Sequence, residues 1–210
     1  VNMYILNFDL NTKFLVAHQS SQERFQVYSY DTALAPTIPY IGVFKEYTHV
    51  AVTIKSNGDV EIFINGSSIG TVNVGTVDMS SITNITRNQS HLSTTFDYEV
   101  DELRIYNKVI SDESILSLSK EGKFIPNEDL VIHYSMDSIN GSIVTNEINP
   151  NVFDGNSLGV EYDLGIVNNE AKFNSQSNEA IQFTPDILND FTISMWVRRN
   201  DGESKNGHVM

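Results

Sequence analysis

The chain has 210 residues, 40% of them hydrophobic, which is enough for one well-buried core and typical of a single all-β sandwich. Thirteen Lys and Arg stand against 27 Asp and Glu, so the formal net charge is −14. Nucleic acids and anionic membrane surfaces bind clustered Lys and Arg, so we expect neither as a partner. Cysteine is absent, which excludes disulfides, thiolate metal sites and cysteine nucleophiles. No apolar run approaches the roughly 18 residues of a membrane-spanning helix, and the first residues lack the basic start of a signal peptide.

The first strongly patterned segment predicts a β-hairpin. Residues 49–54 alternate between apolar and polar side chains, and residues 60–64 do so again after a break at Asn57-Gly58. A second Asn-Gly pair, Asn65-Gly66, ends the run. Asn-Gly supplies the positive φ that tight turns require, so both pairs are predicted to be turns between antiparallel strands.

Further along the chain, residues 98–106 predict another strand, and one short helix is expected near residues 111–120. Ser111 is suited to cap that helix, and two acidic residues follow in its first turn, where the helix dipole favours anions. Gly122 is expected to end it. Many short strands and one small helix predict an all-β fold, a two-sheet antiparallel β-sandwich of the jelly-roll type.

The last strongly patterned strand, residues 191–197, alternates cleanly. One face carries apolar side chains and is predicted to face the core between the sheets: Phe191, Ile193, Met195 and Val197. The opposite face carries Thr192, Ser194, Trp196 and Arg198.

Two of these segments carry a family resemblance. Residues 44–53, followed by residues 60–66, resemble the central hairpin of laminin-G-like domains in the concanavalin A-like lectin/glucanase superfamily, with Tyr47 where tryptophan is usual. Residues 100–107, with the helix that starts at Ser111, resemble the closing strand and terminal helix of the same family. The resemblance implies a jelly-roll sandwich.

The order of the motifs is swapped relative to the family. Four later segments resemble the family's opening strands: residues 130–137, 169–173, 180–183 and 191–197. Residues 1–124 therefore resemble the second half of a sandwich, and residues 125–210 resemble the first half. Either the chain is a circular permutant, or it spans the end of one repeat and the start of the next in a tandem array. We expect one sandwich closed from both halves, because exposed half-cores associate.

The resemblance implies a noncatalytic recognition or adhesion module, most often for glycans or glycoproteins, on a secreted, cell-surface or virion protein. A structural or assembly repeat of a fibre, sheath or viral appendage is the alternative, with half-sandwiches exchanged between copies of the chain. Glucanases of this fold carry three carboxylates in the pattern Glu-x-Asp-x-x-Glu. Here Glu99 and Asp101 are followed by Arg104, so we predict that the protein is not an enzyme.

Ligand contacts are predicted at four residues: Trp196, Arg198, Asn84 and Asn88. An indole on an outer sheet face can stack on a sugar ring, although packing against neighbours is the more common role. The two asparagines lie in a polar loop segment, where lectin-like relatives place many contacts. His49 is expected to hydrogen-bond its surroundings within the hairpin motif.

One structural Ca²⁺ is predicted, because many relatives carry one. Asp101 is expected to share its strand face with Leu103 and Ile105, and to meet Asp137 from the neighbouring opening strand. Carboxylates with backbone carbonyls supply the oxygen ligands that Ca²⁺ prefers. The alternative is that Asp101 pairs with Arg104 or with a nearby backbone amide.

Overall fold

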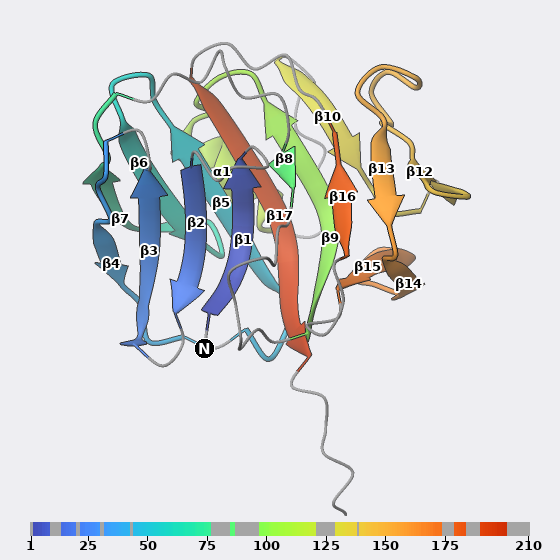
Figure 1. Ribbon diagram of the computed structural model, residues 1–210, viewed down its shortest axis with the longest axis horizontal. Helices are drawn as coiled ribbons and strands as arrows, with labels where there is room; N and C mark the ends of the chain where they lie inside the picture. The colour runs from blue at the N-terminus through green and yellow to red at the C-terminus, as the bar shows by residue number, and fades with distance from the viewer. Residues whose placement is uncertain are drawn as a thin grey trace, which may run out of the picture.

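The computed structural model describes residues 2–8, 14–19, 22–29, 32–42, 44–76, 85–86, 97–120, 129–137, 139–173, 179–183 and 190–200. Its strands form two packed layers (Figure 1). This architecture is the predicted β-sandwich.

The larger layer is one sheet in the order β14-β15-β9-β17-β5-β6-β7, with β10 also paired to β9. Its strands are β5 (Thr48–Ile54), β6 (Asp59–Ile64), β7 (Ser67–Asn73), β9 (Asp97–Tyr106), β10 (Leu130–Tyr134), β14 (Glu161–Leu164), β15 (Asn169–Phe173) and β17 (Phe191–Asn200). All the pairings in this sheet are antiparallel.

The second layer contains two smaller sheets, in the orders β4-β3-β2-β1-β8 and β11-β12-β13-β16, and β16 lies against β8. The strands are β1 (Asn2–Phe8), β2 (Phe14–Gln19), β3 (Arg24–Ser29), β4 (Thr37–Pro39), β8 (Ile85–Thr86), β11 (Ile139–Asn140), β12 (Ile143–Val144), β13 (Gly155–Leu158) and β16 (Ala180–Gln182). The sequence patterns had not predicted β1–β4 or β11–β14, and β8 lies in a segment that was expected to be a loop.

Strand β17 lies in the middle of the larger sheet, although it comes last in the chain. It pairs with β5 on one side, from Phe191 opposite Ile54 to Val197 opposite Thr48. It pairs with β9 on its other side. Strands from residues 1–124 and from residues 125–210 therefore share one sheet. Whether this reflects a circular permutant or a tandem array stays a prediction.

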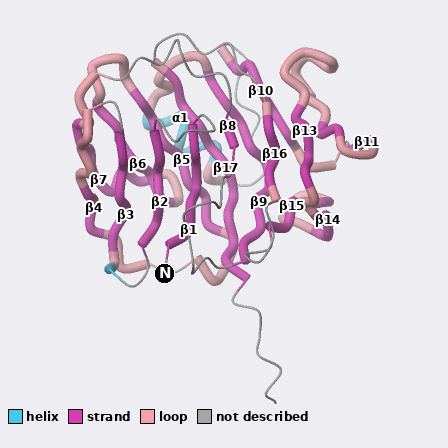
Figure 2. Tube along the Cα trace, in the orientation of Figure 1, coloured by secondary structure: helices cyan, strands magenta, loops and turns pink. Residues whose placement is uncertain are grey.

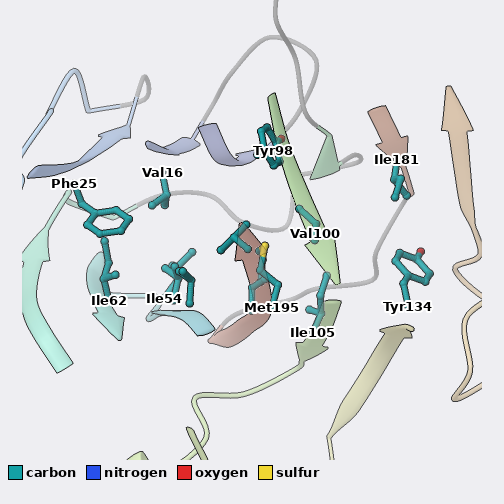
Figure 3. Packing of buried hydrophobic residues seen from close by; sticks show 14 of the residues in the cluster. Val16, Phe25, Ile54, Ile62, Tyr98, Val100, Ile105, Tyr134, Ile181 and Met195 are labelled. Carbon is teal, nitrogen blue, oxygen red and sulfur yellow. The ribbon is translucent and has the colours of Figure 1, made fainter. Parts of the chain in front are cut away.

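The main core fills the space between the two layers (Figure 3). Val16 and Phe25 from the second layer face Ile54, Ile62 and Met195 from the larger sheet. The four apolar residues predicted to face the core from β17 all belong to this cluster: Phe191, Ile193, Met195 and Val197. The face assignment from the sequence is therefore confirmed.

The helix α1 (Asp112–Leu118) covers part of the outer face of the larger sheet, the face turned away from β1–β4 (Figure 2). The Ser111 side chain caps it by accepting from the Ser114 amide, as predicted. Ile115 and Leu118 are buried in a second apolar cluster with residues of the sheet. The helix ends at Leu118, earlier than expected, and Gly122 lies outside the described residues.

The turn at Asn65-Gly66 has the predicted conformation. Both residues have positive φ, 49° and 80°, and they join β6 to β7 directly. This is the geometry of a two-residue hairpin turn whose twist matches that of the strands. Asn-Gly at this position therefore fixes the register of the β6–β7 pair.

Candidate functional site

A β-bulge in β9 shapes the outer face of the larger sheet. Arg104 stands opposite Ser194 and Asp101 stands opposite Trp196, so two residues of β9 face only Met195 between them. Glu102 adopts a φ of 55°, in the left-handed region that side-chain-bearing residues seldom occupy. The extra residue shifts the alternation along the strand.

This bulge overturns the predicted side-chain directions in β9. Val100 and Ile105 both belong to the core between the sheets, and Leu103 packs against it. Val100 and Leu103 thus face the same side although they are three residues apart, which unbroken alternation would not allow. Asp101 directly follows Val100 and lies on the opposite face, so it does not share a face with Leu103 and Ile105. The prediction assumed unbroken alternation, which a single bulge reverses for every later residue.

Glu102 joins two basic side chains on the outer face. Its carboxylate accepts from the Arg104 guanidinium, and the His133 Nε2 atom lies 2.8 Å from Glu102 Oε2. The side chains of Arg104 and His133 are 22% and 19% exposed, whereas that of Glu102 is 8% exposed. Burial acts to raise the pKa of Glu102, but His133 and Arg104 outweigh it and the pKa lies below its usual value. We call Glu102, Arg104 and His133 the outer-face cluster.

Beside this cluster, His49 and Trp196 pack edge to face, with ring centroids 5.4 Å apart. His49 Nε2 lies 2.8 Å from the Ser194 hydroxyl, so the predicted hydrogen bonding of His49 is confirmed. Burial, and then the charge of Arg104, lower the pKa of His49 to about 4. Trp196 is 8% exposed, which leaves its ring packed rather than open for stacking on a sugar.

Arg198 is held by several groups at once. Its guanidinium donates to Glu99, lies 3.6 Å from Glu170 Oε1 and sits 4.5 Å above the centre of the Tyr47 ring. Its side chain remains 35% exposed, so it can still donate to a molecule from solvent. The other predicted ligand residues, Asn84 and Asn88, lie outside the described residues.

Asp101 and Asp137 both bind one loop, the turn between β14 and β15. Asp101 Oδ2 accepts from the amides of Ile166 and Val167, at 2.9 and 3.1 Å. Asp137 Oδ1 accepts from the Asn169 amide at 2.7 Å, and Oδ2 accepts from the Asn168 side chain at 2.9 Å. The two carboxylates are thus brought to the same loop, and the backbone-amide alternative describes Asp101 correctly.

The electrostatics of Asp101 follow from its burial. It is fully buried, and burial raises the pKa of its carboxyl to about 6, although the Val167 amide acts in the opposite direction. Its Oδ1 atom is buried and makes no hydrogen bond with the described residues.

This donor arrangement does not suit Ca²⁺. The ion needs six to eight oxygen ligands. Here the loop turns N–H groups toward three of the four carboxylate oxygens of Asp101 and Asp137, and N–H dipoles repel a cation. Within the described part of the chain, no group of three or more His, Asp or Glu side chains is arranged to hold a metal. The predicted calcium therefore lacks a complete ligand set among these residues.

The comparison with protein families agrees with the fold. Residues 5–116 match the profile of the concanavalin A-like lectin/glucanases superfamily, in its laminin G branch. The match spans more than half of the chain, so the chain belongs to this family. A search of curated proteins found no match. The resemblance of residues 125–210 to the family's opening strands lies outside the matched range.

Laminin G-like domains are often extracellular. Among the described residues, no helix is long and apolar enough to cross a membrane.

The outer-face cluster was not predicted from the sequence. Glu102 and His133 come together only because the bulge turns Glu102 outward and β10 pairs with β9. One signal was present: Asp101 and Glu102 are adjacent charged residues within a strand, where strict alternation would bury one of them in the core. Such a pair favours a bulge.

Proposed function

We propose that this protein is a noncatalytic recognition module that binds carbohydrate, carried on a secreted, cell-surface or virion protein. Family membership supports a binding role. The observation that carries the proposal is the outer-face cluster, where Arg104 and His133 are partly exposed beside a buried carboxylate. Charged groups held by neighbours in this way are preorganised to hydrogen-bond sugar hydroxyls.

The charges of the cluster support binding rather than hydrolysis. A retaining glycosidase needs one carboxyl that is protonated and a second that acts as nucleophile. The pKa of Glu102 is held down by His133 and Arg104, which keeps its carboxylate ionised. Glu99 is engaged by Arg198. Glu102 and Glu99 are therefore each paired with an arginine, whereas Asp101, whose pKa burial raises to about 6, is fully buried and bonded to the backbone amides of a loop.

The test is a broad glycan array probed with three proteins: the wild type, Arg104→Gln and Arg24→Gln. Arg24 lies in β3 of the other layer, where it donates to Gln19, so its replacement is a matched control. We expect signals that Arg104→Gln loses and Arg24→Gln keeps. A blank array, both with Ca²⁺ and with chelator, would refute carbohydrate binding. Equal signals from all three proteins would place the binding site elsewhere.

A second candidate function is assembly, and the position of β17 favours it. This strand fills the place between β5 and β9, yet it reaches that place from the far end of the chain. Exchange of β17 between copies would join chains head to tail without new contacts. Light scattering across a range of protein concentrations tests this. A mass that rises with concentration supports exchange, and a constant monomer mass excludes it.

A further inference from the structure

Asn-Gly pairs occur four times in the sequence, beginning at Asn57, Asn65, Asn140 and Asn206. The last lies outside the described residues. Asparagine is among the chemically labile residues of proteins. A glycine that follows it has no side chain to hinder the approach of the next backbone nitrogen to the asparagine side chain. The three described pairs share the same dipeptide but have very different surroundings.

The pair at Asn57 is restrained at every atom that a backbone attack would use. The Asn57 side chain donates to Asp59 Oδ2 at 2.9 Å and accepts from the Asp59 amide at 3.0 Å. The Gly58 amide, which would be the nucleophile, donates to the Lys55 carbonyl at 2.8 Å. Gly58 is also buried.

The pair at Asn65 is restrained by the sheet and the helix. Asn65 Oδ1 accepts from the His49 amide at 3.0 Å, and the Asn65 amide donates to the His49 carbonyl at 2.8 Å. Gly66 lies against α1, since a Cβ there would come within 2.6–2.8 Å of atoms of Ser119 and Leu116. The turn cannot change shape without disturbing the helix.

The pair at Asn140 lacks these restraints. It lies in the hairpin between β11 and β12, where Asn140 stands opposite Ile143 and both Asn140 and Gly141 are exposed. Neither the Asn140 side chain nor the Gly141 amide hydrogen-bonds to any residue that the structure describes. A Cβ at Gly141 would meet no described atom within 4 Å, and Gly141 has a φ of 64°.

We propose that Asn140 is a site of spontaneous deamidation, with water as the only co-reactant. The Gly141 backbone nitrogen attacks the Asn140 side-chain carbonyl carbon. A carbon–nitrogen bond forms, the amide nitrogen leaves with a proton as ammonia, and a cyclic succinimide results. Water then opens the ring at either carbonyl, which gives aspartate or isoaspartate, with no oxidant or reductant involved.

The consequences are confined to one edge of the molecule. β11 is the edge strand of its four-stranded sheet and has only two residues. Isoaspartate would lengthen the backbone by one carbon within that hairpin, while both products add one negative charge. The main core cluster includes Val144 of β12 but no residue of β11, so the fold is expected to persist.

Incubation of the full chain in water labelled with oxygen-18 at mildly alkaline pH, followed by peptide mass spectrometry, tests the proposal. Each hydrogen bond that must break slows the attack by about three- to tenfold, so Asn140 is expected to react at least about tenfold faster than Asn57 and Asn65. The heavy oxygen should appear in the Asn140 peptide, and Asn140→Gln should abolish that early acidic product.

The same incubation in concentrated urea is the control for the fold. There the three sites should react at similar rates, because the restraints on Asn57 and Asn65 are gone. Equal rates at the three sites in the folded protein would overturn the proposal. If Asn140 still reacted faster than Asn57 and Asn65 in urea, the proposal would also be overturned, because the local sequence rather than the structure would then set the rate.

Discussion

Replacing His49 by glutamine should remove part of the acid sensitivity of the protein. His49 is 1% exposed, its Nε2 atom lies 2.8 Å from the Ser194 hydroxyl, and its Nδ1 atom is buried without a hydrogen bond to the described residues. Protonation would leave a second buried N–H group without a hydrogen-bond acceptor. It would also place a positive charge near that of Arg104. Burial, and then Arg104, accordingly lower the pKa of His49 from 6.5 to about 4.

The sign and size of the pH dependence that His49 gives to the free energy of unfolding follow from the linkage between proton binding and folding. Between pH 6.5 and 4 the unfolded chain binds a proton at His49 that the folded protein does not, so the stability from the neutral ring is complete above pH 6.5 and is lost as the pH falls toward 4. A shift from 6.5 to about 4 corresponds to about 3 kcal/mol. His18 has a pKa lowered to about 4 by burial and then by Arg199, but it is present in both proteins and cancels.

Urea unfolding of the wild type and of His49→Gln, followed by fluorescence at several pH values from 7.5 to 4, measures this difference. Trp196 is the sole tryptophan and packs against the His49 ring, so it reports on the same place. The free energy of unfolding of the wild type should fall by about 3 kcal/mol more than that of the variant. A difference that stays constant with pH would refute the reasoning, because it would mean that His49 titrates alike in both states.

Four further substitutions have expected outcomes. Ile193→Ala empties a fully buried position in β17 and should cost about 3–4 kcal/mol in urea unfolding, whereas Leu164→Ala, at a residue 77% exposed, should stay within about 0.5 kcal/mol. Asn146→Asp replaces the two donors that bond the Val131 and Val152 carbonyls with an acceptor, and a loss below about 1 kcal/mol would contradict the expected 2–4 kcal/mol. The wild type and Asp101→Asn should each melt at the same temperature in Ca²⁺ and in chelator. A calcium-dependent rise in the wild type alone would restore the metal site.

Local patterns predicted the elements whose causes are local. The β5–β6 pair follows from alternation, and the Asn65-Gly66 turn follows from the φ that these residues tolerate. Ser111 caps α1 through a hydrogen bond only three residues away. The faces of β17 were predictable because no bulge interrupts its apolar alternation.

What the sequence did not predict depends on partners far along the chain. The bulge at Glu102 is stabilised by Arg104 and by His133 of another strand, 31 residues away. Asp101 and Asp137 were expected to meet at a metal, whereas in the structure each bonds to the same loop, which has no distinctive sequence pattern. Distant N–H donors decide whether a carboxylate holds a loop or a metal, and spacing along one strand carries no information about them.

The pairing of charges on the outer face bears on which ligands suit it. Glu99 pairs with Arg198, and Glu102 pairs with Arg104 and hydrogen-bonds His133, so the guanidinium groups of that face lie next to carboxylates. An anionic ligand would meet buried carboxylates behind each cation, and a cationic ligand would meet the guanidinium groups first. Neutral hydroxyl-rich molecules face neither penalty, because a hydroxyl both donates to a carboxylate and accepts from a guanidinium. The charge pattern therefore favours neutral sugars over charged ones as ligands of the proposed site.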